Sequence, residues 1–256
     1  MNKLKHLAML KLRASSSYPL FIGETGLTDN QQQTLDSLLA KIKLTEKQAI
    51  LRDELIAKRD APYELSAGAR TLIEEAVEEQ LWGYKPSFSS RETTKGTMVE
   101  EDSIDLYNRL NFTSYTKSDM SLSYKGILSG HPDITNDETR VVIDIKSPWS
   151  KKTFPKTVEK ARNPQYEWQV KLYLFMLTKQ TGVHWRYGRI AYMLVNTPEE
   201  LIPDSENDSL HYMDDLPDNL RQVIVPVELT EDDIKKIDER LDIAVKYANK
   251  YRERWT

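Results

Sequence analysis

In the first third of the chain, apolar residues recur at the three- and four-residue spacing of amphipathic helices. Within residues 28–60 the apolar positions that keep this spacing are Leu35, Leu38, Leu39 and Ile42. The pattern weakens near Leu44 and Thr45, so a break in the helical segment is expected there. A further helix is predicted over residues 66–81, with Ser66 as its N-cap, because a serine hydroxyl can accept a bond from an early N–H group.

The middle of the chain mixes helical and β-type patterns. Residues 82–94 are predicted to be a loop, and a helix is expected from about Thr97 to residue 110. Short β-type runs follow at residues 114–130 and 140–147, joined by polar turns. A basic loop over residues 150–164 then leads to a helix predicted over residues 165–180.

The last part of the chain continues the mixed pattern. Residues 188–196 are predicted to form a strand, and the acidic residues 198–219 an exposed loop. Residues 221–229 indicate an edge strand, because Pro226 lacks the N–H group that an inner strand needs. A terminal helix is predicted over residues 231–255.

This order of elements predicts a single α/β domain over residues 1–256, with a small mixed sheet flanked by helices. Residues 1–65 would form a helical region at the N-terminus, and residues 66–198 the core. The acidic loop, the edge strand and the terminal helix would occupy residues 199–256.

Composition narrows the class of protein. The chain has 256 residues, 39% of them hydrophobic, and no cysteine, which excludes disulfides, thiolate metal sites and a cysteine nucleophile. No apolar run approaches the length of about 20 residues that a membrane span needs, and residues 1–15 lack the apolar segment of a signal peptide. We therefore expect a soluble, cytoplasmic protein without a membrane partner. The net charge of −4 means that binding to nucleic acid would need a local basic surface.

The segment at residues 129–150 carries the most specific chemistry. Gly130 and Pro132 bound a turn that presents Asp133. Alternate residues of a strand share a face, so Asp144 and Lys146 would stand together, opposite the apolar side of the run. Two carboxylates and a main-chain carbonyl are the oxygen ligands that Mg²⁺ prefers. A surface hairpin with an ordinary ion pair is the alternative interpretation.

Three further side chains fit the same site. Gln169 and Tyr173 are four residues apart on a predicted helix, so their polar ends share one face. Glu100 stands near a predicted helix start, where it could be a third acidic ligand or a partner of the helix dipole. A buried tyrosine with a satisfied glutamine is the alternative for the first pair.

Four ordered segments together resemble the PD-(D/E)XK nuclease superfamily, and in particular its lambda-exonuclease-like (YqaJ-type) branch. The segments are "GHPD" at 130–133, "DIK" at 144–146, "QVKLY" at 169–173, and the Gly-x-x-x-Glu spacing from Gly96 to Glu100. The resemblance covers roughly residues 66–198 and implies a restriction-endonuclease-like core.

The resemblance also implies a function. It implies a metal-dependent deoxyribonuclease that hydrolyses phosphodiester bonds, and specifically a phage or prophage recombination exonuclease acting on ends of duplex DNA. Alternatives are an endonuclease or flap nuclease with the same core, or a DNA-binding module without turnover. Its partners would be DNA, a single-strand annealing protein and further copies of the chain in a ring-like trimer, in the cytoplasm of the host.

Residue by residue, the resemblance assigns roles at the reacting phosphate. One or two Mg²⁺ or Mn²⁺ ions would be held by Glu100, Asp133, Asp144 and the carbonyl of Ile145. Lys146 would orient the attacking water, Gln169 would shape the site, and Tyr173 would pack or touch phosphate. Glu101 competes with Glu100 for the ligand role.

Two further segments are expected to contact DNA. "LRASSS" at residues 12–17 is similar to the segment that receives a terminal phosphate, which assigns this role to Arg13, Ser15 and Ser16. His131 stands where the branch often has a small hydroxyl residue, and it could contact a phosphate or be structural. Residues 150–162 carry five cations against Glu159, so Lys151, Lys152 and Lys156 are expected to meet the phosphate backbone. A merely solvated loop is the alternative.

Overall fold

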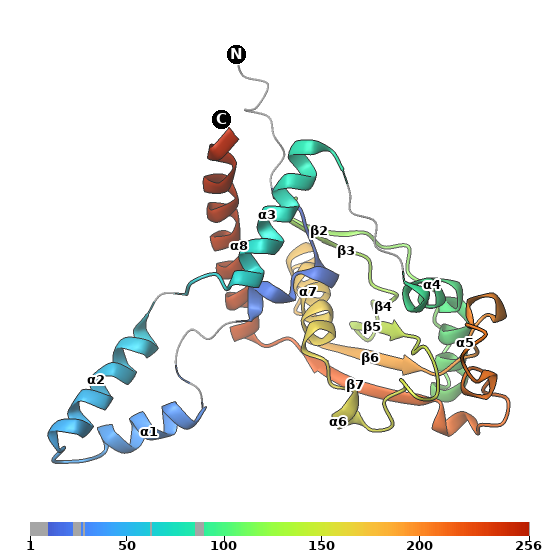
Figure 1. The fold of residues 1–256 in the computed structure, drawn as a ribbon, viewed down its shortest axis with the longest axis horizontal. Helices are drawn as coiled ribbons and strands as arrows, with labels where there is room; N and C mark the ends of the chain where they lie inside the picture. The colour runs from blue at the N-terminus through green and yellow to red at the C-terminus, as the bar shows by residue number, and fades with distance from the viewer. Residues whose placement is uncertain (1–9, 23–26, 28, 62, 85–89, 256) are drawn as a thin grey trace.

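The computed structural model describes residues 10–22, 27, 29–61, 63–84 and 90–255 (Figure 1). Residues 1–9, in the segment where no signal peptide was expected, and Thr28, where the first helical segment was predicted to begin, lie outside these ranges. The helices are α1 (Asp29–Leu39), α2 (Glu46–Asp60), α3 (Ala67–Trp82), α4 (Arg91–Met98), α5 (Glu100–Asn111), α6 (Val158–Ala161), α7 (Pro164–Thr181) and α8 (Glu231–Arg252). The strands are β1 (Leu12–Arg13), β2 (Leu122–Tyr124), β3 (Leu128–Gly130), β4 (Ile134–Asn136), β5 (Val141–Lys146), β6 (Tyr187–Met193) and β7 (Gln222–Glu228).

The strands form two mixed sheets, where the sequence pattern predicted one. A three-stranded sheet has the order β1-β3-β2, and a four-stranded sheet has the order β4-β5-β6-β7. In the larger sheet β5 runs parallel to β6 and antiparallel to β4, while β7 is an edge strand as predicted. Pairing of the two-residue β1 with β3 is a long-range contact that no local pattern indicates. The α/β class itself is confirmed.

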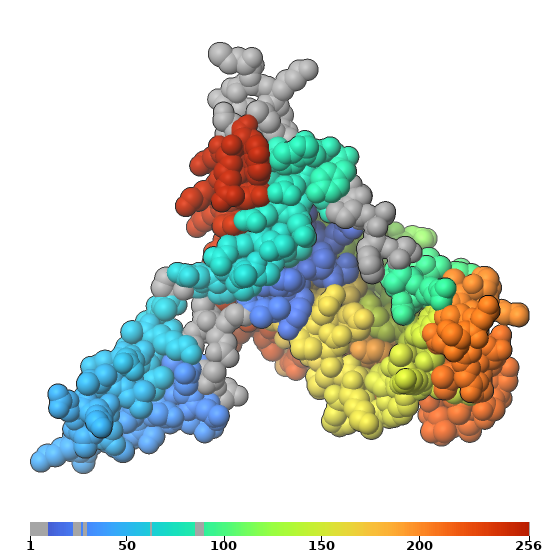
Figure 2. Space-filling model, viewed as in Figure 1, coloured from blue at the N-terminus to red at the C-terminus, as the bar shows by residue number. Residues whose placement is uncertain are grey.

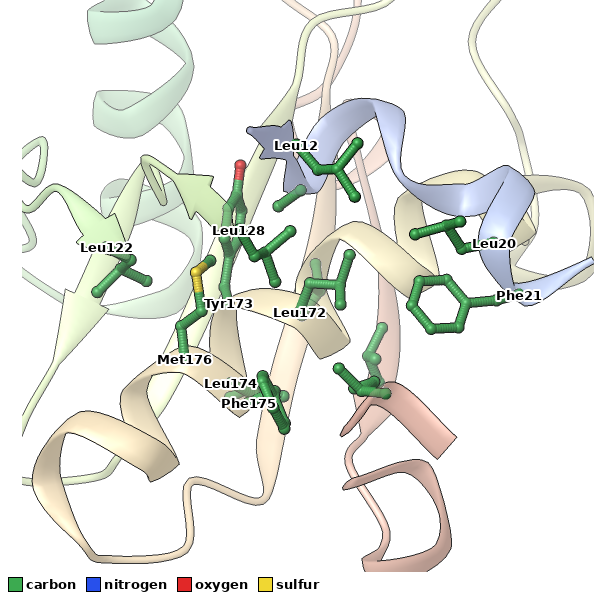
Figure 3. Close-up of a cluster of buried hydrophobic side chains, with 14 of the residues drawn as sticks. Leu12, Leu20, Phe21, Leu122, Leu128, Leu172, Tyr173, Leu174, Phe175 and Met176 are labelled. Carbon is green, nitrogen blue, oxygen red and sulfur yellow. The ribbon is translucent and has the colours of Figure 1, made fainter. Parts of the chain in front are cut away.

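Helix α7 packs against both sheets and forms the centre of the main core. Its buried residues, among them Leu172 and Phe175, share one cluster with Leu12 and Leu128 of the smaller sheet (Figure 3). Val142 and Ile190 bring the larger sheet into the same cluster.

The opposite face of the larger sheet packs against α5. Ile143 and Ile145 of β5 are buried there with Ile104 and Tyr107 of α5. The alternation predicted for β5 is therefore confirmed, because Asp144 lies on the other face, which α7 covers.

Helices α1 and α2 form a hairpin that projects from the rest of the molecule (Figure 2). The two helices bury a small cluster of their own, with Leu35, Leu38 and Leu55 at its centre. The predicted break is confirmed, because α1 ends at Leu39 and Thr45 caps the start of α2: its hydroxyl accepts from the N–H of Gln48, whose side chain accepts from the N–H of Thr45.

The prediction of a loop over residues 82–94 was wrong at its C-terminal end. Helix α4 begins at Arg91, where the hydroxyl of Ser90 caps it by accepting from the N–H of Thr93 at 3.2 Å. A second helix, α5, then starts at Glu100, so the single helix expected from about Thr97 is two short helices.

Candidate active site

A cleft of about 920 Å³ opens where β3, β4 and β5 meet α4, α5 and α7. Its lining includes all of the side chains predicted to act at the reacting phosphate: Glu100, Asp133, Asp144, Lys146, Gln169 and Tyr173. Ile145 also lines it. Residues more than 70 positions apart in the sequence therefore face one hollow.

Asp144 is held from two sides in the interior of the cleft. Its carboxylate is only 1% exposed, and its Oδ1 accepts from Nε2 of Gln169 at 3.0 Å. Its Oδ2 lies 2.7 Å from Nζ of Lys146. The same Nε2 donates to the hydroxyl of Tyr173 at 2.8 Å, so Gln169 and Tyr173 share one helix face as their spacing predicted.

Position 130 requires a glycine because the ring of Tyr173 packs against it. A Cβ atom at Gly130 would lie 2.4 Å from the ring of Tyr173, which no side chain could tolerate without a shift. The absence of a side chain lets the end of β3 pack directly on α7 and brings Asp133 beside the end of β5.

Asp133 is fixed by the strand that carries Asp144. Its Oδ2 accepts from the main-chain N–H of Ile145 at 2.7 Å. Burial, followed by the charge of Asp144, raises the pKa of Asp133 to about 7, although the N–H of Ile145 and the ammonium of Lys146 act against the rise. A cation bound beside both carboxylates would offset the charge of Asp144 that acts on Asp133.

Lys146 stays protonated in this environment. Burial, the largest single influence, works to lower its pKa, but the charge and hydrogen bond of Asp144 together with the charges of Asp133 and Tyr166 outweigh it, and the net effect is a raised pKa. Its ammonium also lies 4.6 Å from the centre of the Tyr166 ring, within the range of a cation–π contact. A protonated lysine can orient a water molecule or contact a phosphate oxygen, but it cannot accept a proton.

Glu100 lines the cleft, whereas Glu101 is exposed and does not. Oε2 of Glu100 lies 2.6 Å from Nζ of Lys117. Within the described residues, no group of three or more acidic or histidine side chains is arranged to hold a metal ion by itself. Glu100 would have to leave Lys117 to join the two aspartates.

The donor set nevertheless fits a hard divalent cation. Asp133, Asp144 and the Ile145 carbonyl supply oxygen only, which Mg²⁺ and Mn²⁺ prefer. Apart from its ion pair with Lys146, the buried Oδ2 of Asp144 has no hydrogen-bond partner. Because that oxygen already meets the Lys146 ammonium, a metal ion bound there would share it with Lys146.

Some of the residues predicted to bind DNA lie at this cleft. Arg13, Ser15 and His131 line it, because β1 pairs with β3 and sets Arg13 opposite Ser129. The side chain of Arg13 is 59% exposed and lies 4.0 Å from Glu79. Ser16 is exposed, does not line the cleft, and donates to the carbonyl of Arg13 at 3.3 Å.

The lysines of the basic loop lie outside the cleft lining. Nζ of Lys151 pairs with Asp215 at 2.7 Å. Nζ of Lys156 donates to main-chain carbonyls of its own loop, including that of Phe154 at 2.6 Å. Lys152 is exposed. Two of the three cations are therefore engaged within the protein.

A second hollow, of about 380 Å³, meets the cleft at Arg13 and Ser129, which line both. Its other walls come from β1 and the C-terminal end of α3, including Glu79, and from the half-exposed Tyr84. The space on the far side of Arg13 is therefore large enough to hold more than a terminal phosphate.

Tyr166 and Trp149 are among the cleft residues that sequence reasoning missed. Tyr166 lies three positions before Gln169 and seven before Tyr173, so helical spacing alone would have placed it on the same face of α7. Trp149 follows β5 and is buried at the cleft wall. No local pattern marks Trp149, because its place depends on the turn after β5.

No helix of the described chain is long and apolar enough to cross a membrane.

Comparison with solved structures shows which proteins share this fold. A phage-related exonuclease from Haemophilus somnus 129PT superposes with a TM-score of 0.75 at 20% identity, covering 99% of this chain and 100% of that one. An alkaline exonuclease from Laribacter hongkongensis gives a TM-score of 0.55 at 14% identity, over 95% of this chain and 90% of that one. The same protein in complex with dAMP gives 0.53 at 15% identity, over the same shares of both chains.

Sequence comparisons found no match, either to a family model or to a curated protein. At these identities the structural matches establish the fold. They confirm the α/β fold that the sequence indicated, which this chain shares with these two exonucleases.

Proposed function

We propose that this protein is a metal-dependent deoxyribonuclease that hydrolyses phosphodiester bonds at the Asp133–Asp144 pair. The observation that carries the proposal is the pair itself: two carboxylates held in one cleft, one by the Ile145 N–H group and one by Gln169, with Lys146 beside them. The fold shared with exonucleases supports the same reaction class.

Each residue of the cleft has its own proposed role in the reaction. Asp133, Asp144 and the Ile145 carbonyl would hold Mg²⁺ or Mn²⁺, one or two ions, with Glu100 joining after it releases Lys117. When bound, the ion would neutralise phosphate charge and lower the pKa of a bound water. Lys146, kept protonated by Asp144, would orient the attacking water against the phosphorus.

Gln169 and Tyr173 act on the carboxylate. Because Gln169 donates to Oδ1 of Asp144, Oδ2 is left for Lys146 and a cation. Tyr173 accepts from the same amide and holds its orientation. A bound phosphate could reach Tyr173 only at its edge, since its ring is buried.

We favour exonuclease action on duplex ends. Arg13 and Ser15 stand at the edge of the cleft, where a terminal phosphate would meet a planar guanidinium and a hydroxyl. A second candidate is a flap nuclease or endonuclease, because the hollow beyond Arg13 gives room for a strand that continues past this point. A role in phage recombination, with a single-strand annealing protein, extends the proposal by resemblance.

Assembly into a ring-like trimer is part of the same proposal. Leu39 and Ile42 at the end of the α1–α2 hairpin are 53% and 101% exposed, which supports a contact with another copy. Light scattering after size exclusion would give the mass: about three times 29.7 kDa is expected, and a monomer would contradict this part.

The test of the proposed reaction is a digestion of linear duplex DNA. Wild type with Mg²⁺ should release nucleotides, and EDTA should stop the release. Lys146→Met should be slower by about 10²-fold or more, the usual cost of losing the group that orients a reactant. Lys47→Met, at an exposed lysine of α2, serves as the matched control. Undiminished release in EDTA would overturn the metal-dependent reaction.

A further inference from the structure

Lys95 is a fully buried lysine in the wall of the cleft. It belongs to α4, and its side chain has no exposed surface. Its Nζ donates to the carbonyl of Pro148 at 2.6 Å and to the carbonyls of Trp149 and Val195 at 3.1 Å each. Within the part of the chain that the structure describes, no carboxylate forms an ion pair with it.

Burying an ammonium group without a carboxylate is unfavourable. Burial lowers the pKa of Lys95 to about 8, while the three carbonyls act to keep it charged. An apolar side chain of similar length would fill this space without losing the hydration of a charge. The ammonium group is therefore accounted for by the three carbonyls that its hydrogen bonds join.

The three bonds join two walls of the cleft. Pro148 and Trp149 come directly after β5, which carries Asp144 and Lys146, and Val195 comes directly after β6. On the other side, α4 supplies Gly96 and Thr97 to the lining of the cleft.

Glu100 is placed by the same connection. It lies five residues after Lys95, at the first position of α5, and only Val99 separates α4 from α5. The side chain of Val99 is itself buried against the face of the sheet that Ile145 shares. The position of Glu100 relative to β5 therefore depends on how α4 is anchored.

We infer that Lys95 is a positioning residue, whose ammonium group ties α4 and the start of α5 to the ends of β5 and β6. It thereby sets the distance from Glu100 to the Asp133–Asp144 pair. The anchoring of α4 is independent of the reaction, whereas the consequence for metal binding rests on the proposed function.

The anchoring is tested without metal or DNA. The chain has no cysteine, so two spin labels can be placed in one protein, at Asp105→Cys on α5 and Lys160→Cys in α6, both exposed positions. Lys95→Met, which keeps the length of the side chain and removes the charge, should broaden or shift the distance distribution between the labels. Lys47→Met should leave it unchanged. An unchanged distribution in Lys95→Met would overturn the inference.

The consequence for the site is tested by a double-mutant cycle on Mn²⁺ affinity. Lys95→Met and Glu100→Gln should each weaken binding, by up to about tenfold, and the double variant should be no weaker than the weaker single variant. Independent, multiplicative losses would overturn the claim that Lys95 acts through Glu100, as would an unchanged affinity in Lys95→Met.

Failure of the proposed function and failure of the anchoring by Lys95 give different results. Should wild type bind no Mn²⁺ and cut no DNA, the proposed function fails, while the label distances still decide whether Lys95 anchors α4. Should Lys95→Met fail to fold, Lys95→Leu, which also lacks any N–H donor, gives both measurements. For Lys95→Leu, wild-type distances together with wild-type affinity would overturn the inference.

Discussion

The ammonium group of Lys146 lies 2.7 Å from Oδ2 of Asp144, on a strand whose alternation brings both side chains to the face covered by α7. The other oxygen of this carboxylate accepts from Gln169. Asp144 is thus held by two partners in a buried place, and its charge acts on the second carboxylate of the cleft, Asp133. The consequences for Asp133 can be measured.

The stability of the metal-free protein should depend on Asp133. Its pKa is about 7 in the folded chain, against the model-compound value of 3.8. Between these values the folded state holds a proton that the unfolded state has lost. This contribution to stability is therefore fully present below pH 3.8 and lost as the pH rises to about 7. Urea unfolding in EDTA at about pH 5 and about pH 8 measures it.

The matched variant is Asp133→Asn, which cannot titrate. Wild type should lose more stability than this variant between the two pH values. Mn²⁺ affinity of wild type should rise as the pH passes about 7, because the metal competes with the proton on Asp133. The same pH dependence of stability in both proteins would contradict the assignment.

The third acidic ligand is predicted to be Glu100. Glu100→Gln should weaken Mn²⁺ binding, and Glu101→Gln should leave it nearly unchanged, because only Glu100 lines the cleft. Lys117→Ala should tighten binding by up to about fivefold, since a half-exposed ion pair such as Lys117–Glu100 is worth about 0–1 kcal/mol. Calorimetric titration of the four proteins gives the order. A larger effect at Glu101 would shift the motif by one residue.

Most of β5 and of α7 could be predicted from the sequence because both are governed by local periodicity. A period of two put Asp144 and Lys146 on one face, and a spacing of four put Gln169 beside Tyr173. The turn at Gly130 could also be predicted from the sequence. The contact with the Tyr173 ring, which makes a glycine necessary there, could not.

The rest depends on contacts between distant segments. β1 has two residues and exists only because it pairs with β3, so the division into two sheets could not be inferred. The start of α4 reads as a polar loop, and a lysine in it predicts a solvated surface. Lys95 is buried because the ends of β5 and β6 supply carbonyls, which no local pattern reports.

Arg13 should set the preference for DNA ends. If it grips a terminal phosphate, wild type should cut 5′-phosphorylated duplex about tenfold faster than 5′-hydroxyl duplex, in line with a charge-assisted hydrogen bond. Arg13→Ala should lose this ratio and keep its fold, because the contact with Glu79 is 4.0 Å long and exposed. Equal rates on both ends in wild type, or cutting of covalently closed circles, would favour the flap or endonuclease candidate.

The basic loop should contribute less to DNA binding than its charge indicates. Lys151 and Lys156 are engaged within the protein, which leaves Lys152 as the freely exposed cation of the three. Changing all three to Ala should flatten the salt dependence of affinity by about one unit, the value for one phosphate contact. Affinity would be measured across a salt series with Ca²⁺ in place of Mg²⁺. A change of about three units would mean that all three lysines reach phosphates.

The most direct test of the account is the single-turnover rate of nucleotide release from linear duplex DNA by Asp144→Asn and wild type, both with Mg²⁺. Asparagine keeps the shape of the side chain and its contact with Gln169 but removes the charge that holds Lys146 and a cation. We predict a rate at least about 10²-fold below that of wild type, from the loss of a charged ligand, with an unchanged circular dichroism spectrum. A folded Asp144→Asn protein that releases nucleotides at the wild-type rate would contradict the account.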